Sequence, residues 1–243
     1  QPLRLLQRFM HRNTLRGSRR NIEAHYDLGN DLFGLFLDDT MMYSCGIFHN
    51  EHASLQDASE AKLARICEKL QLSPSDHVLE IGTGWGGFAL YAARHHGCRV
   101  TTTTISRQQY EYAVERVKSA GLEDRITILF DDYRELQGQY DKLVSIEMIE
   151  AVGHRYFDTY FRKCNELLKP DGMMLLQSIT IADQRYPRMK KSTDFIQRYI
   201  FPGGCLPSVS VLGDAIARKT DMRIFHLEDI GPHYATTLKK WRE

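Results

Sequence analysis

The sequence predicts an α/β fold in which helices cover both faces of a doubly wound, mostly parallel sheet. Short apolar runs alternate with segments of helical periodicity from residue 78 to residue 227, a pattern typical of parallel strands joined by right-handed helical crossovers. A glycine-rich turn directly follows the first of these runs, at residues 78–86. The chain has 243 residues, which is enough to bury one large core. We therefore expect one domain of this class.

Each expected strand is a short run of apolar and β-branched residues between turn signals. The strands are predicted at residues 78–81, 99–104, 126–130, 142–146, 172–180 and 222–227. One helix is expected to start after Ser54, whose pairing with Asp57 resembles a capping box. Further helices are expected at residues 87–96, 106–121 and 208–219, and before the fifth strand.

Two of the predicted helices have a clear apolar face. In the helix that ends at Gly121, the buried face is predicted to consist of Tyr110, Ala113, Val114 and Val117. In the helix before the fifth strand, the inward-facing residues are predicted to be Tyr156, Phe157, Tyr160, Phe161, Cys164 and Leu168. Their spacing of three and four residues places them on one side of a helix.

Residues 1–70 are predicted to form a helical cap of the same domain, and residues 71–243 its core. Residues 181–207 are rich in Arg, Lys and aromatic residues, and we expect this long insertion to be a lid. The chain lacks an initiator Met and stops inside a predicted helix, so we expect a piece of a longer protein without the closing C-terminal strand.

The first twenty residues contain only basic charges, namely Arg4, Arg8, Arg12, Arg16, Arg19 and Arg20. An apolar stripe runs beside them, made of Leu5, Leu6, Phe9 and Met10. This pattern is typical of a basic amphipathic helix that is attracted to anionic lipid. The alternative is an arginine-flanked helix that packs on the domain.

Composition narrows the function classes. The formal net charge is +1 and the pI is about 7.8, so nothing indicates a nucleic-acid partner. No run approaches the roughly 18 apolar residues of a membrane span, and no signal peptide is visible. The five cysteines are odd in number and lack C-x-x-C pairing, which favours a reducing cytosol and argues against disulfides or a metal site.

The glycine turn suits a nucleotide-like cofactor. Gly82, Gly84 and Gly86 remove the side chains that would keep the backbone away from a ligand, and the helix expected at residues 87–96 would point its free N–H groups into the turn. The spacing lacks the G-x-x-G ending of a dinucleotide site, and Glu80 precedes the first glycine. This form fits S-adenosylmethionine (AdoMet) better than NAD. A purely structural turn is the alternative.

Ligands of a doubly wound sheet bind at the carboxyl ends of its strands. An acid commonly follows the second strand and holds the ribose, but here the sequence is TTTTIS. Thr104 and Gln109 would therefore supply neutral hydrogen bonds instead. After the third strand, Asp132 and Tyr133 are candidates to bind the adenine, by accepting a hydrogen bond and by stacking. The alternative for each is an ordinary polar loop residue.

Two carboxylates, Glu147 and Glu150, follow the fourth strand. Only one of them need face the pocket, and position 150 is preferred because it lies beyond the strand end. A carboxylate beside an apolar substrate would be desolvated, which raises its pKa. The alternative is a solvated acid at the start of a helix.

Eight segments are together similar, in order and spacing, to the cyclopropane fatty acid synthase family. They are NIEAHYDLGNDLF, MMYSCGIF, VLEIGTGWGG, TTISRQQ, the segment around Glu150, LLQSITI, YIFPGGCLPS and HYATTLKKW. The resemblance runs from about residue 20 to the end of the chain. It implies a Rossmann-like class I AdoMet methyltransferase that acts on the cis double bond of an acyl chain, usually within a phospholipid.

The resemblance also implies roles for individual residues. The cofactor would contact Tyr43, Ser44, Glu80, Gly82, Thr83, Gly84, Trp85, Gly86, Thr104, Gln109, Asp132, Tyr133 and Arg134. A bicarbonate ion, which this family holds in its active site, would be bound by Cys45, Glu150, Tyr234 and the backbone of Ile179. The remaining ligand of the best-known members is a histidine, and Gln177 stands at that position. Glutamine can donate a hydrogen bond, but unlike histidine it cannot take up a proton or carry a charge.

The expected reaction is methyl transfer from AdoMet to an unsaturated phospholipid acyl chain, with a cyclopropane as product. The protein would work in the cytoplasm, peripherally at the inner face of the membrane and in contact with anionic lipid. The oligomeric state stays open, with a homodimer as one option. Two alternatives also stay open: a small-molecule N-methyltransferase on the same scaffold, and an AdoMet- or lipid-binding protein without catalysis.

Overall fold

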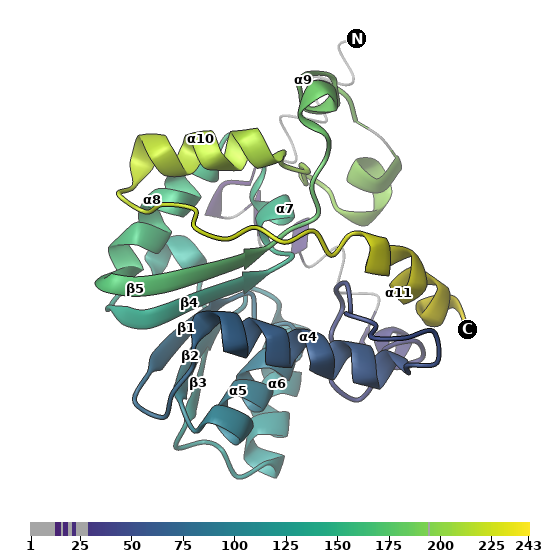
Figure 1. Cartoon of the computed structure of the whole chain (residues 1–243), viewed down its shortest axis with the longest axis vertical. Coiled ribbons are helices and arrows are strands. Elements are labelled where there is room, and N and C mark those ends of the chain that lie inside the picture. Colours follow the sequence, from purple (N-terminus) through teal and green to yellow (C-terminus); the bar gives the residue numbers. More distant parts are fainter. Residues whose placement is uncertain (1–12, 16, 19–20, 23–28, 194) are drawn as a thin grey trace.

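Five parallel strands form one sheet in the order β3-β2-β1-β4-β5 (Figure 1). The structure is a computed structural model that describes residues 13–15, 17–18, 21–22, 29–193 and 195–243. The strands are β1 (His77–Ile81), β2 (Arg99–Thr103), β3 (Ile126–Leu129), β4 (Tyr140–Ile146) and β5 (Leu168–Gln177). The chain runs outward from β1 to β3 and then crosses to β4 on the other side of β1. This reversal creates the crevice in which doubly wound folds bind ligands.

Helices cover both faces of the sheet, as predicted. One face packs against α4 (Leu55–Leu70), α5 (Gly87–His96) and α6 (Arg107–Ser119), and the other against α8 (Phe157–Leu167) and α10 (Val209–Lys219) (Figure 1). Between residues 29 and 243, the other α-helices are α3 (Asn30–Gly34), α7 (Ile149–Val152), α9 (Tyr186–Met189) and α11 (Pro232–Arg242). The predicted capping box of α4 is present, because Ser54 and Asp57 each accept the other's backbone N–H.

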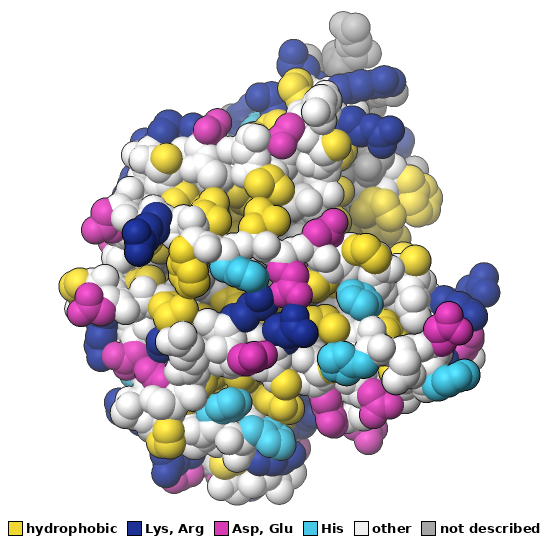
Figure 2. Space-filling model, viewed as in Figure 1, with side chains coloured by type: hydrophobic (Ala, Val, Ile, Leu, Met, Phe, Trp, Pro, Cys, Tyr) yellow, Lys and Arg dark blue, Asp and Glu magenta, His cyan; other side chains and the backbone are white. Residues whose placement is uncertain are grey.

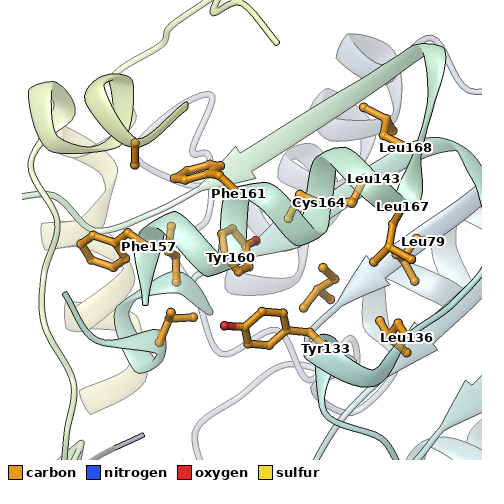
Figure 3. Close-up of a cluster of buried hydrophobic side chains, with 14 of the residues drawn as sticks. Leu79, Tyr133, Leu136, Leu143, Phe157, Tyr160, Phe161, Cys164, Leu167 and Leu168 are labelled. Atoms are coloured by element: carbon orange, nitrogen blue, oxygen red, sulfur yellow. The ribbon is translucent and has the colours of Figure 1, made fainter. Parts of the chain in front are cut away.

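The aromatic face of α8 anchors the second half of the fold (Figure 3). Tyr160 is fully buried, and its ring meets Tyr133 and Phe161 edge-on at centroid distances of 5.4 and 5.3 Å. Edge-to-face pairs of this kind add to the hydrophobic gain of burying large rings. The packing fixes α8, and with it the turn that leads from β4 into α7 and α8.

The prediction of a strand at residues 222–227 is wrong. This segment is extended but joins no ladder, and it crosses the molecule from α10 to α11 (Figure 1). Phe225 is 67% exposed. At its end Glu228 forms ion pairs of 2.6 Å with Arg65 and 2.8 Å with Lys69, both on α4. Contacts with a distant helix, rather than pairing with the sheet, therefore set the path of this segment.

Smaller corrections concern boundaries and faces. β5 begins at Leu168 rather than near Gly172, with a register irregularity opposite residues 140–142. Val114 is 39% exposed and does not belong to the buried face of α6, whereas Gln109 is buried there. The other predicted strands agree with the structure to within two residues.

The insertion at residues 181–207 begins and ends at the same place in the domain. Ile181 N–H donates to the Pro207 carbonyl at 2.9 Å, and Cys205 N–H donates to the Glu150 carbonyl at 2.8 Å. Between these ties the segment contains α9 and the short helical turns Asp183–Arg185 and Ile196–Ile200. The predicted lid is thus a long insertion whose two ends meet beside Glu150. Its movement stays a prediction.

The predicted stripe of Leu5, Leu6, Phe9 and Met10 lies outside the described residues. Asn13 is described and buried, and its amide donates to the carbonyls of Ala151, Val152 and Gly203. Within the described part of the chain, no helix has the length and apolarity to cross a membrane, and no cluster of His, Cys, Asp or Glu could hold a metal ion.

Candidate active site

The glycine turn forms as predicted between β1 and α5. Gly82, Gly84 and Gly86 have φ angles of +106°, +53° and +85°, a region that favours glycine. The N–H groups of Gly82 and Thr83 both donate to the Thr103 carbonyl at 3.0 Å, which ties the turn to β2. A Cβ atom built on Gly84 would meet no atom within 4 Å. The turn therefore leaves open space in front of the α5 N-terminus, as an anionic or nucleotide-like ligand requires.

Glu80, at the end of β1, is linked to this turn through hydroxyl groups. Its side chain is 2% exposed, and the Thr102 hydroxyl, 2.7 Å from Glu80 Oε2, is also 2.8 Å from the Thr83 hydroxyl. Burial raises the pKa of Glu80 to about 8, and the hydrogen bond from Thr102 lowers it in part. The predicted cofactor residues Glu80 and Thr83 thus form one buried hydroxyl–carboxyl group under the turn.

Trp85 and Tyr43 join the turn to the N-terminal and C-terminal helices. The Trp85 indole donates to Asn30 Oδ1 at 2.7 Å, and its ring packs on Phe33 at 4.8 Å. Tyr43 lies 5.2 Å from Phe33 and 5.1 Å from Trp241 on α11. These rings enclose the crevice from the cap side. The neighbouring residue Ser44 is buried against Lys62 of α4.

The predicted ribose and adenine residues have different surroundings. Thr104 Oγ1 donates to Gln109 Oε1 at 2.9 Å, and both are buried at the end of β2. The Asp132 carboxylate is paired with Arg134 at 2.6 Å. Tyr133 does not offer the expected stacking face, because its ring is buried in the core against Tyr160. The short helical turn Tyr133–Glu135 directs this ring inward.

A second group of polar residues gathers around Glu147. This residue follows β4 with a φ of +48°, and its side chain is half-buried. Its Oε1 accepts hydrogen bonds from Cys45 N–H at 3.0 Å and from Gln177 Nε2 at 2.8 Å. Its Oε2 accepts from the Tyr234 hydroxyl at 3.0 Å. Residues from β5, α11 and the 43–45 segment therefore converge on one carboxylate.

Glu150 lies in the next turn and has a drier setting. Its Oε1 accepts from the Ser178 hydroxyl at 3.0 Å and from Ile179 N–H at 2.5 Å, while Oε2 is buried and has no hydrogen-bond partner among the described residues. Burial, together with the nearby Glu147 charge, raises the pKa of Glu150 to about 7, although the bonds to its carboxylate lower it in part. This agrees with the predicted desolvation of position 150.

The sequence favours Glu150 over Glu147, but the structure gives Glu147 the larger set of hydrogen-bond partners from distant segments. Both belong to the same polar group, and Glu147 is its centre. The sequence offered a signal for Glu147, an acid placed directly after a strand, but its partners are distant in the chain. Ser178 and Lys62 were not predicted either, although each contacts a predicted site residue.

The predicted bicarbonate ligands do not leave a site for that ion. Cys45, Gln177 and Tyr234 direct their donors at Glu147, and Ile179 N–H is used by Glu150. A second anion placed among these residues would also meet two carboxylates at close range, which is unfavourable at the low dielectric of a buried site.

The two groups are neighbours in space. A Cβ atom on Gly82 would come within 3.2 Å of Met148, which directly follows Glu147. The glycine turn and the carboxylates therefore lie next to each other at the carboxyl ends of β1, β4 and β5.

Comparisons with known proteins agree with this arrangement. The profile of the mycolic acid cyclopropane synthetase family matches residues 13–243. The chain is 42% identical over 233 residues to the tuberculostearic acid methyltransferase UfaA1 of Mycobacterium tuberculosis, covering 93% of this chain and 54% of the relative. It is 44% identical over 226 residues to the cyclopropane-fatty-acyl-phospholipid synthase of Escherichia coli, covering 91% of this chain and 55% of the relative. The chain thus spans about half the length of these curated relatives.

Solved structures show the same likeness. The mycolic acid cyclopropane synthase CmaA1, complexed with SAH and CTAB, superimposes with a TM-score of 0.84 at 32% identity, covering 92% of this chain and 81% of that one. Coclaurine N-methyltransferase, at 24% identity and a TM-score of 0.71, shares the fold. The family profile spans both the glycine turn and the carboxylate group, and the chain belongs to the mycolic acid cyclopropane synthetase family.

Proposed function

We propose that this protein transfers the methyl group of AdoMet to the cis double bond of an unsaturated phospholipid acyl chain, with a cyclopropane as the product. The observation that carries the proposal is that an open glycine turn lies beside a desolvated carboxylate, Glu150, and a second carboxylate, Glu147, held by donors from three segments. The names of the relatives support an acyl-chain substrate, and the SAH complex of CmaA1 supports the cofactor.

The residues of the crevice suit this chemistry. When bound, AdoMet supplies an electron-poor methyl group. An alkene is a weak nucleophile, so holding the two reactants in line must provide much of the rate. Methyl transfer leaves positive charge on the acyl chain, which Glu147 and Glu150 would stabilise from fixed positions. The ring of Tyr234 adjoins Glu147, and those of Trp241 and Tyr43 follow it in a chain of ring contacts. Each favourable ring–cation contact contributes about 0.5–2 kcal/mol.

Lipid analysis tests the proposal. The protein is expressed in a host without such enzymes, and its phospholipids are analysed by mass spectrometry. We expect acyl chains that are heavier by one methylene group and that lack the original double bond. Ozonolysis distinguishes a ring from a methyl-branched alkene. Unchanged lipids, despite calorimetric binding of AdoMet, would contradict catalysis and favour a binding protein.

We further propose contact with anionic membranes through the N-terminal segment and residues 181–207. The insertion carries Arg185, Arg188, Lys190, Lys191 and Arg198, and Phe195 within it is 67% exposed. Figure 2 shows Lys and Arg side chains gathered at the end of the molecule where α9 lies. Basic residues near an anionic surface contribute about 1 kcal/mol each.

Neutralising the N-terminal segment tests this contact. The triple variant Arg4→Gln, Arg8→Gln, Arg12→Gln keeps the buried Asn13 and is expected to bind phosphatidylglycerol vesicles at least about tenfold more weakly. The matched control replaces Arg94, Arg107 and Lys118, which lie on α5 and α6, and should bind as the unchanged protein does. Equal binding by both triple variants in a sedimentation assay would contradict a docking role.

A further inference from the structure

Glu147 has a backbone conformation that its side chain does not favour. Its φ of +48° lies in the left-handed region, where a residue with a Cβ costs about 1–2 kcal/mol relative to the right-handed form. Strain of this kind is common at functional positions, where the surrounding structure enforces it. Here the enforcing contacts are clear, because Glu147 N–H donates to the Gln177 carbonyl at 2.8 Å and both side-chain oxygens are held.

The partners of Glu147 are neutral. Backbone N–H, amide and phenol groups hold its oxygens at 2.8 to 3.0 Å, and none of the ion pairs found among the described residues includes it. The cation Lys62 is buried behind it and contacts Ser44. Pairing with a cation makes a carboxylate a weaker base, and the neutral donors around Glu147 do not add this effect.

We propose that Glu147 is the proton acceptor of the reaction and stands in for the bicarbonate ion that the family resemblance assigns to this place. The inference rests on the proposed function. Three predicted ligands of the ion, Cys45, Gln177 and Tyr234, bind this carboxylate instead. The protein therefore supplies from its own chain the anion that, by the resemblance, would be bound from solution.

The alkene electron pair forms a bond to the methyl carbon while the carbon–sulfur bond breaks, and its electrons leave with sulfur as a neutral thioether. The acyl chain now carries a positive charge beside the new methyl group. Glu147 takes one proton from that methyl group, and the electrons of the broken carbon–hydrogen bond close the three-membered ring. The proton on Glu147 then passes to solvent.

Other groups in the crevice are less suited to this step. Glu150 Oε2 is buried without a hydrogen-bond partner among the described residues, and its Oε1 is held by Ser178 and Ile179, whereas both oxygens of Glu147 are held by donors from other segments. Burial raises the pKa of Cys45 to about 11, so its thiol stays protonated. The Tyr234 hydroxyl donates a hydrogen bond to Glu147. Burial raises the pKa of Tyr234, and the negative charge of Glu147 raises it further, so this hydroxyl stays protonated.

Two variants at one position separate a chemical role from a structural one. Glu147→Gly suits the left-handed backbone and opens a cavity among three unsatisfied donors, whereas Glu147→Gln fills the space without a carboxylate. Both are expected to bind S-adenosylhomocysteine as the unchanged protein does and to lose at least about 100-fold in turnover. Added bicarbonate or formate should restore activity to the Gly variant and not to the Gln variant.

The unchanged protein provides the complementary measurements. Its turnover should be the same in carbon-dioxide-free buffer and with added bicarbonate. With trideuteromethyl AdoMet, one deuterium is lost to form the ring, and the isotope effect on turnover should be larger in the Gln variant because proton removal becomes slower.

The outcomes are distinguishable. A bicarbonate requirement in the unchanged protein, full activity of the Gly variant, or a folded Gly variant that no small anion reactivates would each overturn the role of Glu147. An unchanged protein that binds S-adenosylhomocysteine but modifies no unsaturated acyl chain would overturn the proposed function, and this inference with it.

Discussion

Glu150→Gln is expected to reduce turnover by about 100- to 1000-fold, because a fixed negative charge beside a developing cation acts mainly in the transition state. The substitution keeps the shape of the side chain, and the glutamine oxygen can still accept from Ser178 and Ile179. Binding of S-adenosylhomocysteine, measured by calorimetry, should therefore change little. The matched control is Glu166→Gln, which removes an exposed charge on α8 and should leave turnover unchanged. Normal activity of Glu150→Gln would remove this carboxylate from the chemistry.

The same substitution is expected to stabilise the protein above neutral pH. The unfolded chain ionises Glu150 near its ordinary pKa of 4.5, whereas burial and the charge of Glu147 raise the folded-state pKa to about 7. Between these values the native state binds the proton more tightly, so the free energy of unfolding falls as pH rises. At pH values well above 7 the whole free-energy cost of burying the charge is present, about 3 kcal/mol.

Urea unfolding at pH 5 and pH 8 measures this difference. Glu150→Gln should be more stable than the unchanged protein at pH 8 and nearly equal to it at pH 5. The charged and titratable groups around the site, namely Glu147, Tyr234, Cys45 and Lys62, are present in both proteins, and so is Glu80. Their contributions therefore largely cancel in the comparison. Parallel stability profiles would show that Glu150 is not desolvated in the native protein.

Turnover should show the matching pH dependence. In the unchanged protein it is expected to rise with pH through about 7, as Glu150 ionises. The residual activity of Glu150→Gln should lack this rise. Stability and activity thus respond in opposite directions to the same ionisation, which is typical of a residue retained for function.

The sheet and the glycine turn could be predicted because their signals are local. The apolar runs of β1 and β4 end at turn residues. The glycines at positions 82, 84 and 86 have positive φ angles, which favour glycine. Each of these features depends on a few consecutive residues. The position of Glu150 beyond the end of β4 was accessible from the sequence for the same reason.

Features that depend on distant contacts were not predictable in this way. The apolar pattern of residues 222–227 indicates a strand, but ion pairs between Glu228 and α4 place the segment elsewhere. The role of Glu147 depends on Cys45 and Tyr234, which lie 102 and 87 residues away in the chain. The orientation of Tyr133 follows from its packing against α8. In each case tertiary contacts override the local pattern.

Substitutions of Gly84 and Gly87 by valine should separate ligand binding from stability within one turn. A Cβ atom on Gly84 meets no atom of the protein within 4 Å, so Gly84→Val should cost only the left-handed strain of about 1–2 kcal/mol. Its side chain would, however, project into the space proposed for the cofactor. We expect at least about tenfold weaker binding of S-adenosylhomocysteine, equal to about 1.4 kcal/mol of binding free energy.

Gly87→Val should have the opposite profile. Its Cβ atom would lie 2.6 Å from Met42 Sδ and 2.6 Å from the Thr40 carbonyl oxygen, and the backbone oxygen cannot move aside without shifting the 40–42 segment. Overpacking of this kind costs about 1–3 kcal/mol, which lowers the melting temperature of a domain of this size by roughly 2–12 °C. Differential scanning calorimetry with and without S-adenosylhomocysteine measures both effects. If Gly84→Val lowered the melting temperature more than Gly87→Val does, and still bound S-adenosylhomocysteine with full affinity, the open space before α5 would not be the cofactor site.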